Sequence, residues 1–132
     1  MRRILSANLA GKILLAAFAG LLILHVLILL QVVPSEIVWG GQIKDDQSNL
    51  LMLEIIAITV ILVFFGLTAA KMRLLQSGKS KKVINISMWV ILAYLLLNTI
   101  GNLASGVVAE TLIFAPLTLV MAFCALRLAI EK

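Results

Sequence analysis

Long apolar stretches separated by short polar segments dominate the pattern of this 132-residue chain. Three stretches, residues 13–33, 50–70 and 83–103, are each 21 residues long. A helix of that length spans about 31 Å, which is close to the hydrocarbon thickness of a bilayer. A fourth run reaches residue 130 if Arg127 extends its guanidinium to the lipid head groups. The pattern therefore predicts transmembrane helices over 13–33, 50–70, 83–103 and about 112–130.

The connections between these stretches are short. They cover residues 34–49, 71–82 and 104–111. Short connections make sequential helices antiparallel. We therefore expect an all-α membrane protein, with residues 1–132 forming a single four-helix bundle of up-down-up-down topology.

Composition supports lipid as the main surroundings of the chain. Apolar residues of the types AVILMFWYC make up 63% and charged residues 13%, whereas soluble domains have about 45–50% and about 25%. These values argue against a cytosolic enzyme or a nucleic-acid-binding domain and make membrane lipid the expected partner. Cys124 and His25 are the only residues of their types. We therefore expect no disulfide, no metal site and no cofactor such as b-haem, which needs two axial histidines.

The basic residues are distributed very unequally between the two predicted ends of the bundle. Ten of the eleven fall on one side, and only Lys44 falls on the other. The ten are Arg2, Arg3, Lys12, Lys71, Arg73, Lys79, Lys81, Lys82, Arg127 and Lys132. Because cytoplasmic loops carry the excess of Lys and Arg, this asymmetry predicts that both termini are cytoplasmic.

Polar side chains within the spans gather in the outer half of the predicted bundle. From the outer helix ends, at 1.5 Å per residue, the depths are about 6 Å for Glu54, 4.5 Å for Asn102, 10 Å for Asn98 and 13 Å for His25. We therefore expect an amide of Asn98 or Asn102 to bond Glu54. His25 is too deep for Glu54 and is expected to reach Asn98 or Tyr94. Such groups are costly in lipid, so this layer is the candidate ligand-binding or coupling site, although amides also serve simply to hold helices together.

The outer connection and the fourth span add to this layer. Glu36 and Trp39 lie in an unusually apolar loop, and Trp39 is expected to cover the layer as a lid. Glu36 is a further candidate. Pro116 lacks an N–H, so it leaves the carbonyl of Leu112 without its helical partner.

Pairs of small residues four apart recur in the spans, where such pairs allow close helix packing. They are Ala16–Gly20, Gly66–Ala70, Gly101–Ser105 and Ala125–Ala129. They predict either packing within the bundle or a seam for a homo-oligomer.

Three stretches carry a resemblance to known proteins. They are residues 33–41, residues 97–103, and residues 114–119 running into 126–131. Together they resemble a group of small, uncharacterised four-span bacterial membrane proteins. The resemblance implies a multi-pass protein of the bacterial inner (plasma) membrane and implies no activity.

Three functions remain open from the sequence. The preferred one is an accessory protein that binds a lipid-like or small amphipathic ligand, or a membrane partner, in the polar layer. The second is a proton- or cation-coupled small transporter that uses Glu54. The third is a membrane enzyme on a lipid or isoprenoid substrate, with Glu54 and His25 as acid and base; the chain has no nucleophilic or metal-binding motif that favours it.

Overall fold

The computed structural model describes residues 5–41 and 47–132, and it is all-helical over them. Four helices are long and apolar enough to cross a membrane. They are α1 (Ala7–Leu29), α2 (Gln47–Gln76), α3 (Lys82–Ala104) and a fourth formed by the π-helical turn η3 (Glu110–Phe114) and α4 (Ala115–Ala129). The predicted class is thereby confirmed. The charges expected at Arg2, Arg3, Lys44, Asp45 and Asp46 lie outside the described residues.

Helix α1 ends four residues before the predicted boundary at Val33. Its last turn closes through bonds from Gln31 N to Ile28 O and from Val32 N to Leu27 O, both 2.9 Å. Gln31 has a φ of 59°. This is a Schellman ending, in which one residue in the left-handed conformation turns the chain out of the helix. Glycine usually occupies that position, so a glutamine there does not indicate a helix end.

Helix α2 is longer than predicted at both ends. It begins at Gln47 rather than Leu50, and it continues six residues beyond Ala70 to Gln76. Gly78, with a φ of 64°, ends it in the same manner, with Lys79 N bonded to Leu74 O at 2.9 Å. Lys71 and Arg73 therefore lie on the helix and not in a loop.

The fourth helix contains one wide turn immediately before its proline. The N–H of Ala115 bonds the carbonyl of Glu110, five residues earlier. Pro116 follows and has no N–H to donate, so the regular ladder is already interrupted here. A π turn adds one residue to the helical circuit and re-aims the side chains that precede it. It places Glu110 inside the protein, where it is only 5% exposed.

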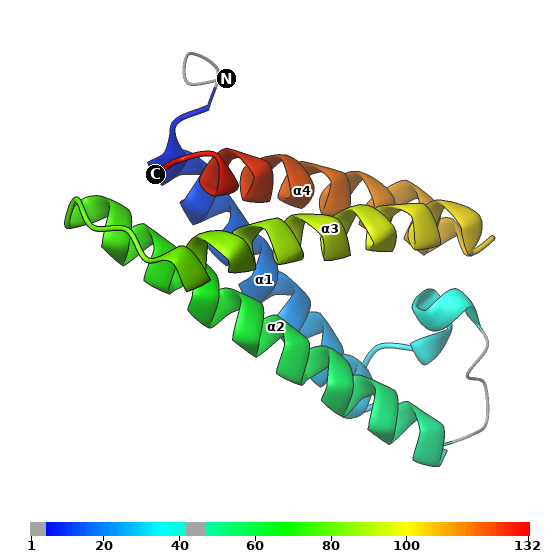
Figure 1. Ribbon diagram of the computed structural model, residues 1–132. Coiled ribbons are helices and arrows are strands. Elements are labelled where there is room, and N and C mark those ends of the chain that lie inside the picture. The colour runs from blue at the N-terminus through cyan, green and yellow to red at the C-terminus, as the bar shows by residue number, and fades with distance from the viewer. Residues whose placement is uncertain (1–4, 42–46) are drawn as a thin grey trace.

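The helices form two neighbouring pairs that diverge toward one end. Figure 1 shows α1 beside α2, and α3 beside α4, with the pairs spreading apart on the right. The short 3₁₀ turns η1 (Ser35–Ile37) and η2 (Trp39–Gly41) occupy that side, which we call the loop end. The first and last described residues and the α2–α3 connection lie at the opposite end, which we call the terminus end.

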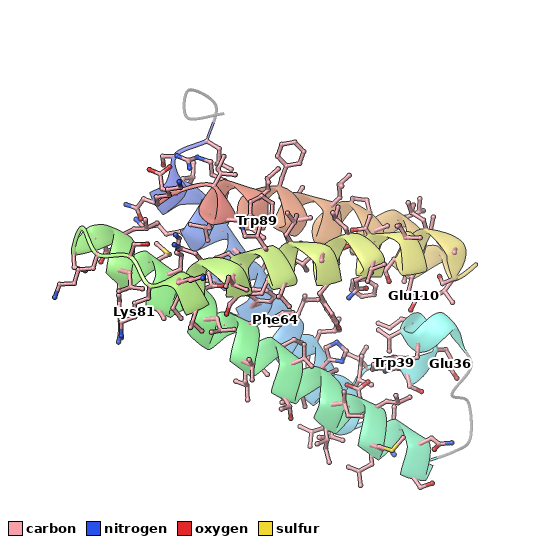
Figure 2. The ribbon with its side chains drawn as sticks, viewed as in Figure 1. Glu36, Trp39, Phe64, Lys81, Trp89 and Glu110 are labelled. Carbon is pink, nitrogen blue, oxygen red and sulfur yellow. The ribbon has the colours of Figure 1, made fainter. Side chains whose placement is uncertain are left out.

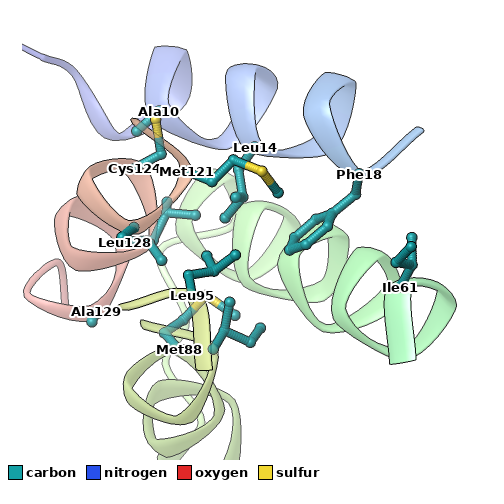
Figure 3. Close-up of a cluster of buried hydrophobic side chains, with 13 residues drawn as sticks. Ala10, Leu14, Phe18, Ile61, Met88, Leu95, Met121, Cys124, Leu128 and Ala129 are labelled. Carbon is teal, nitrogen blue, oxygen red and sulfur yellow. The ribbon is translucent and has the colours of Figure 1, made fainter. Parts of the chain in front are cut away.

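The apolar core lies mainly between the pairs and away from the loop end. It includes Leu14 and Phe18 of α1, Met88 of α3, and Met121 and Leu128 of α4, as Figure 3 shows. Within the most apolar 18 residues of each helix, 50% are buried in the fourth helix, compared with 17–22% in the other three. The fourth helix is therefore the most enclosed of the four, although it is the shortest.

Of the small-residue pairs, only Ala125–Ala129 is buried in the bundle. A Cβ added at Gly20, Gly66 or Gly101 would meet nothing within 4 Å. The close approach of α1 and α2 instead occurs at Gly11, where a Cβ would come within 2.2 Å of Met72 Sδ. The expectation of tight packing at the three other pairs is therefore wrong within this chain.

Two basic side chains point inward at the terminus end. Lys71 is 1% exposed and donates to Asn85 Oδ1 at 2.6 Å and to the carbonyl of Glu131 at 2.5 Å. Arg127 is 3% exposed and donates to the carbonyl of Leu5 at 2.8 Å and to Glu131 Oε2 at 2.6 Å. The expectation that Arg127 extends to the lipid head groups is wrong, because nearby acceptors satisfy its guanidinium inside the bundle.

Candidate functional site

Glu54 is fully buried near the loop end of α2 and is bonded on both carboxylate oxygens. His25 Nδ1 lies 2.6 Å from Glu54 Oε2, and Trp39 Nε1 donates to Glu54 Oε1 at 2.7 Å. The rings of His25 and Trp39 lie with centroids 6.3 Å apart. The carboxylate thus fixes both the imidazole of α1 and the indole of η2.

The expectation that His25 is too deep to reach Glu54 is wrong. In that expectation the depth of His25 was counted from Pro34, but α1 ends at Leu29. His25 therefore lies only four residues, about 6 Å, from the true helix end. Counted in the same way, Glu54 lies seven residues, about 10.5 Å, from the start of α2 at Gln47, so the observed helix ends no longer place His25 deeper than Glu54.

The amides of α3 are not the partners of Glu54. Asn102 Nδ2 donates to Asn98 Oδ1 at 3.2 Å, so the two amides pair along their own helix face. The predicted bond between an amide and Glu54 is therefore wrong. Both amides nevertheless line the same cavity as His25.

The turn η2 holds its conformation against local backbone preference. Trp39, Gly40 and Gly41 have φ values of 57°, 65° and 67°. A bulky residue such as Trp disfavours this left-handed region. The Trp39 indole bond to Glu54 and a bond from Gly40 N to Glu110 Oε1 at 3.1 Å hold the turn in place. Local strain of this kind is often found at functional sites.

Glu110 is a site residue that the sequence did not indicate. Its Oε2 is buried and has no hydrogen-bond partner among the described residues. In Figure 2 Glu110 lies at the start of the fourth helix, close to the loop that carries Trp39. In the sequence, an acidic residue just before an apolar run indicates only a helix N-terminus. The π turn in the structure is what shows that this carboxylate points inward.

A cavity of about 140 Å³ lies at the loop end between the two helix pairs. Most of the residues that line it are apolar. One of them is Phe64, which lies between α2 and α3 (Figure 2). Its polar lining comes from α1, α3, the fourth helix and the loop, whereas the α2 residues that line it are apolar: the polar residues are His25, Trp39, Tyr94, Asn98, Asn102, Glu110 and Thr118. Glu54 does not line the cavity, but it contacts His25 and Trp39, which do.

The remaining candidates differ in their relation to this cavity. Tyr94 lines it and packs edge-on against Phe64, with ring centroids 5.1 Å apart. Glu36 is exposed on η1 and does not line it. The structure thus brings together Glu54, His25 and Trp39 as one cluster, with Tyr94, Asn98 and Asn102 across the cavity, and leaves Glu36 outside.

The described residues contain no group of three His, Cys, Asp or Glu side chains that could hold a metal ion. The polar groups present at the site offer hydrogen bonding and charge. Its carboxylate oxygens accept hydrogen bonds, its side-chain amides both donate and accept them, and it contains one imidazole. Comparison with protein-family models, with curated proteins and with solved structures gives no match for this chain.

Proposed function

We propose that this chain is an integral membrane protein whose loop-end cavity binds a small amphipathic ligand through a hydrogen-bond donor. The observation that carries the proposal is the unpaired Oε2 of Glu110. A buried acceptor without a partner costs about 1–3 kcal/mol, and a ligand donor would remove that cost. Among the residues that the structure describes, Thr68 Oγ1 is the other buried side-chain oxygen without a partner, and it does not line the cavity.

The size and lining of the cavity define the ligand class. An apolar cavity of about 150 Å³ is known to hold benzene, and this one has about 140 Å³. The bound portion is therefore one ring or a short alkyl segment rather than a whole two-chain lipid. Carboxylate oxygens only accept hydrogen bonds, so the head of the ligand is an amine or a hydroxyl.

Thermal stability in detergent tests the proposal with benzylamine, benzyl alcohol and toluene as probes. Glu110→Gln keeps one oxygen for Gly40 but replaces Oε2 by an amide that donates. We expect benzylamine and benzyl alcohol to raise the Tm of the native protein but not of this variant, and toluene to affect both equally. A ligand at a hundred times its Kd stabilises by about 2.7 kcal/mol, which is easily measured.

Glu36→Gln is the matched control, because it removes an exposed carboxylate from the same end of the protein. It should respond to the three probes as the native protein does. If benzylamine stabilises Glu110→Gln as strongly as the native protein, the proposed role of Glu110 is wrong.

Coupled transport remains the second candidate, because His25 and Glu54 form a titratable pair within the spans. Transport needs a polar route through the bundle, however. On the side of the cavity toward the terminus end lie the buried apolar side chains of Leu14, Phe18 and Met121. This apolar core, together with the exclusion of Glu54 from the cavity lining, favours binding over transport and over acid–base catalysis by Glu54 and His25.

We further propose that the termini face the cytoplasm of a bacterium, with the protein in its inner membrane and the helices running up-down-up-down. The basic residues Lys12, Lys71, Arg73, Lys79 and Lys81 belong to segments at the terminus end (Figure 1), which supports this orientation by the positive-inside rule. The bacterial origin rests on the sequence resemblance. The uncovered faces at Gly20 and Gly101 leave room for a second copy in the membrane.

A further inference from the structure

A second hollow lies at the terminus end, far from the cavity. It is a groove of about 690 Å³ over α2 and the beginning of α3. Gly66, Ala69, Ala70 and Arg73 line it. These residues have the spacing i, i+3, i+4 and i+7, so they follow one face of α2. That face therefore has almost no side-chain bulk for about one turn, and Arg73 follows one turn later.

The groove is apolar along the helix and cationic at its end. Besides Arg73, its lining includes Lys79 and Lys81 of the α2–α3 connection, and no lining residue is acidic. All three cationic side chains are exposed, and none forms an ion pair with another described residue. Figure 2 shows Lys81 at the terminus end of the molecule.

The length of the groove fits the phosphate and the adjoining half of one phospholipid tail. Seven residues separate Gly66 from Arg73, a distance of about 10.5 Å along the helix axis. A Cβ at Gly66 would meet nothing within 4 Å, so the protein itself does not fill this surface. An acyl chain could lie against the small residues while the phosphodiester contacts the three cations.

We propose that this groove binds one anionic phospholipid of the leaflet that the terminus end contacts. Charge complementarity selects the occupant, because three unpaired cations at the end of an apolar surface match a lipid that carries net negative charge. The proposal uses none of the residues of the loop-end cavity. It therefore stands or falls independently of the proposed function.

The test counts lipids bound to the purified full chain by native mass spectrometry in a neutral detergent. The probes are dioleoylphosphatidylglycerol, zwitterionic dioleoylphosphatidylcholine, inorganic phosphate and an acidic peptide, poly-glutamate. We expect one phosphatidylglycerol to bind at least tenfold more tightly than phosphatidylcholine. Phosphate or poly-glutamate that binds as tightly as phosphatidylglycerol would overturn the assignment to a lipid.

Two variants and two matched controls locate the lipid. Each surface cation changes affinity for an anionic membrane by about fivefold, so Arg73→Gln/Lys79→Gln/Lys81→Gln should weaken phosphatidylglycerol by roughly a hundredfold. The control, Lys12→Gln/Lys82→Gln/Lys132→Gln, removes the same net charge from exposed residues that do not line the groove. Equal losses in the two triple variants would show diffuse attraction and overturn the proposal.

Gly66→Leu adds bulk to the apolar part of the groove at a position where a Cβ meets nothing within 4 Å, and Gly20→Leu makes the same change at another such position. We expect only Gly66→Leu to weaken phosphatidylglycerol, by about tenfold, with the helical circular dichroism of both variants unchanged. Unchanged binding by Gly66→Leu would exclude an acyl chain from the groove.

Discussion

Glu54 is the side chain on which the arrangement at the loop end depends. Removing its carboxyl leaves the indole N–H of Trp39 and the imidazole of His25 without their acceptor. We therefore expect Glu54→Leu to destabilise the protein by about 1–3 kcal/mol. Glu54→Gln keeps an oxygen for Trp39 and should cost less than half as much. Thermal unfolding in detergent measures both, and Glu36→Gln, at an exposed site, should be neutral.

The contact between His25 and Glu54 can be separated from simple burial by a double-mutant cycle. The variants are His25→Phe, Glu54→Gln and the pair together. Polar contacts between membrane helices contribute about 0.6–1.7 kcal/mol, so we expect a coupling energy of about 1 kcal/mol. A cycle with Tyr94→Phe in place of His25→Phe should give none. A larger coupling of Glu54 with Tyr94 than with His25 would contradict the contact between His25 and Glu54.

Part of this site could be predicted from the sequence, and the rest could not. A carboxyl inside an apolar span must find partners, and an indole in an apolar outer loop is a natural cover, so Glu54 and Trp39 were identifiable. The pairing with His25 was not. It depends on where α1 ends, and that end is set by Gln31 in a conformation that its residue type does not favour.

The π turn η3 determines where Glu110 points. Deleting the exposed residue Ile113 removes the extra residue of this turn, and one residue corresponds to about 100° of rotation in an α-helix. Glu110 should then leave the cavity and release the amide of Gly40. We expect hydrogen exchange at Gly40 to become about tenfold faster. Ile113→Ala, which shortens the side chain but keeps the turn, should leave exchange unchanged.

Close packing of α1 on α2 depends on the missing side chain at Gly11. Gly11→Ala places a Cβ within 2.2 Å of Met72 Sδ and should destabilise by about 1–3 kcal/mol through overpacking. Adding Met72→Ala should recover part of that loss. Gly20→Ala, where the space is open, should instead gain about 0.5–1 kcal/mol from reduced chain freedom. Destabilisation at both glycines would contradict this packing.

The number and type of the helices followed from the sequence because apolar length alone indicates a span. Their ends and rotations did not follow. The fourth helix had the shortest apolar run and proved to be the most enclosed, since its small residues, such as Ala125, are buried where it packs against α1 and α3. Hydropathy reports how apolar a segment is and not whether it faces lipid or protein.

At the scale of the whole molecule, the proposed orientation has a direct test. Single cysteines at Glu36 and Ser80, both exposed positions, would be introduced with Cys124 replaced by Ala. A membrane-impermeant thiol reagent applied to intact cells should label the cysteine at Glu36 and leave that at Ser80 unmodified until the cells are permeabilised. The reverse pattern would place the cavity on the cytoplasmic side.

The buried Lys71 has a consequence for the order in which the chain assembles. Its acceptors are Asn85 on α3 and the carbonyl of Glu131, which follows Lys71 by sixty residues. During synthesis α2 emerges with an ammonium that lipid cannot satisfy, and its second acceptor is made only after α3 and α4. The terminus end therefore closes last. Until then Lys71 lacks its second acceptor, so this end of the fold is completed only once residue 131 has been made.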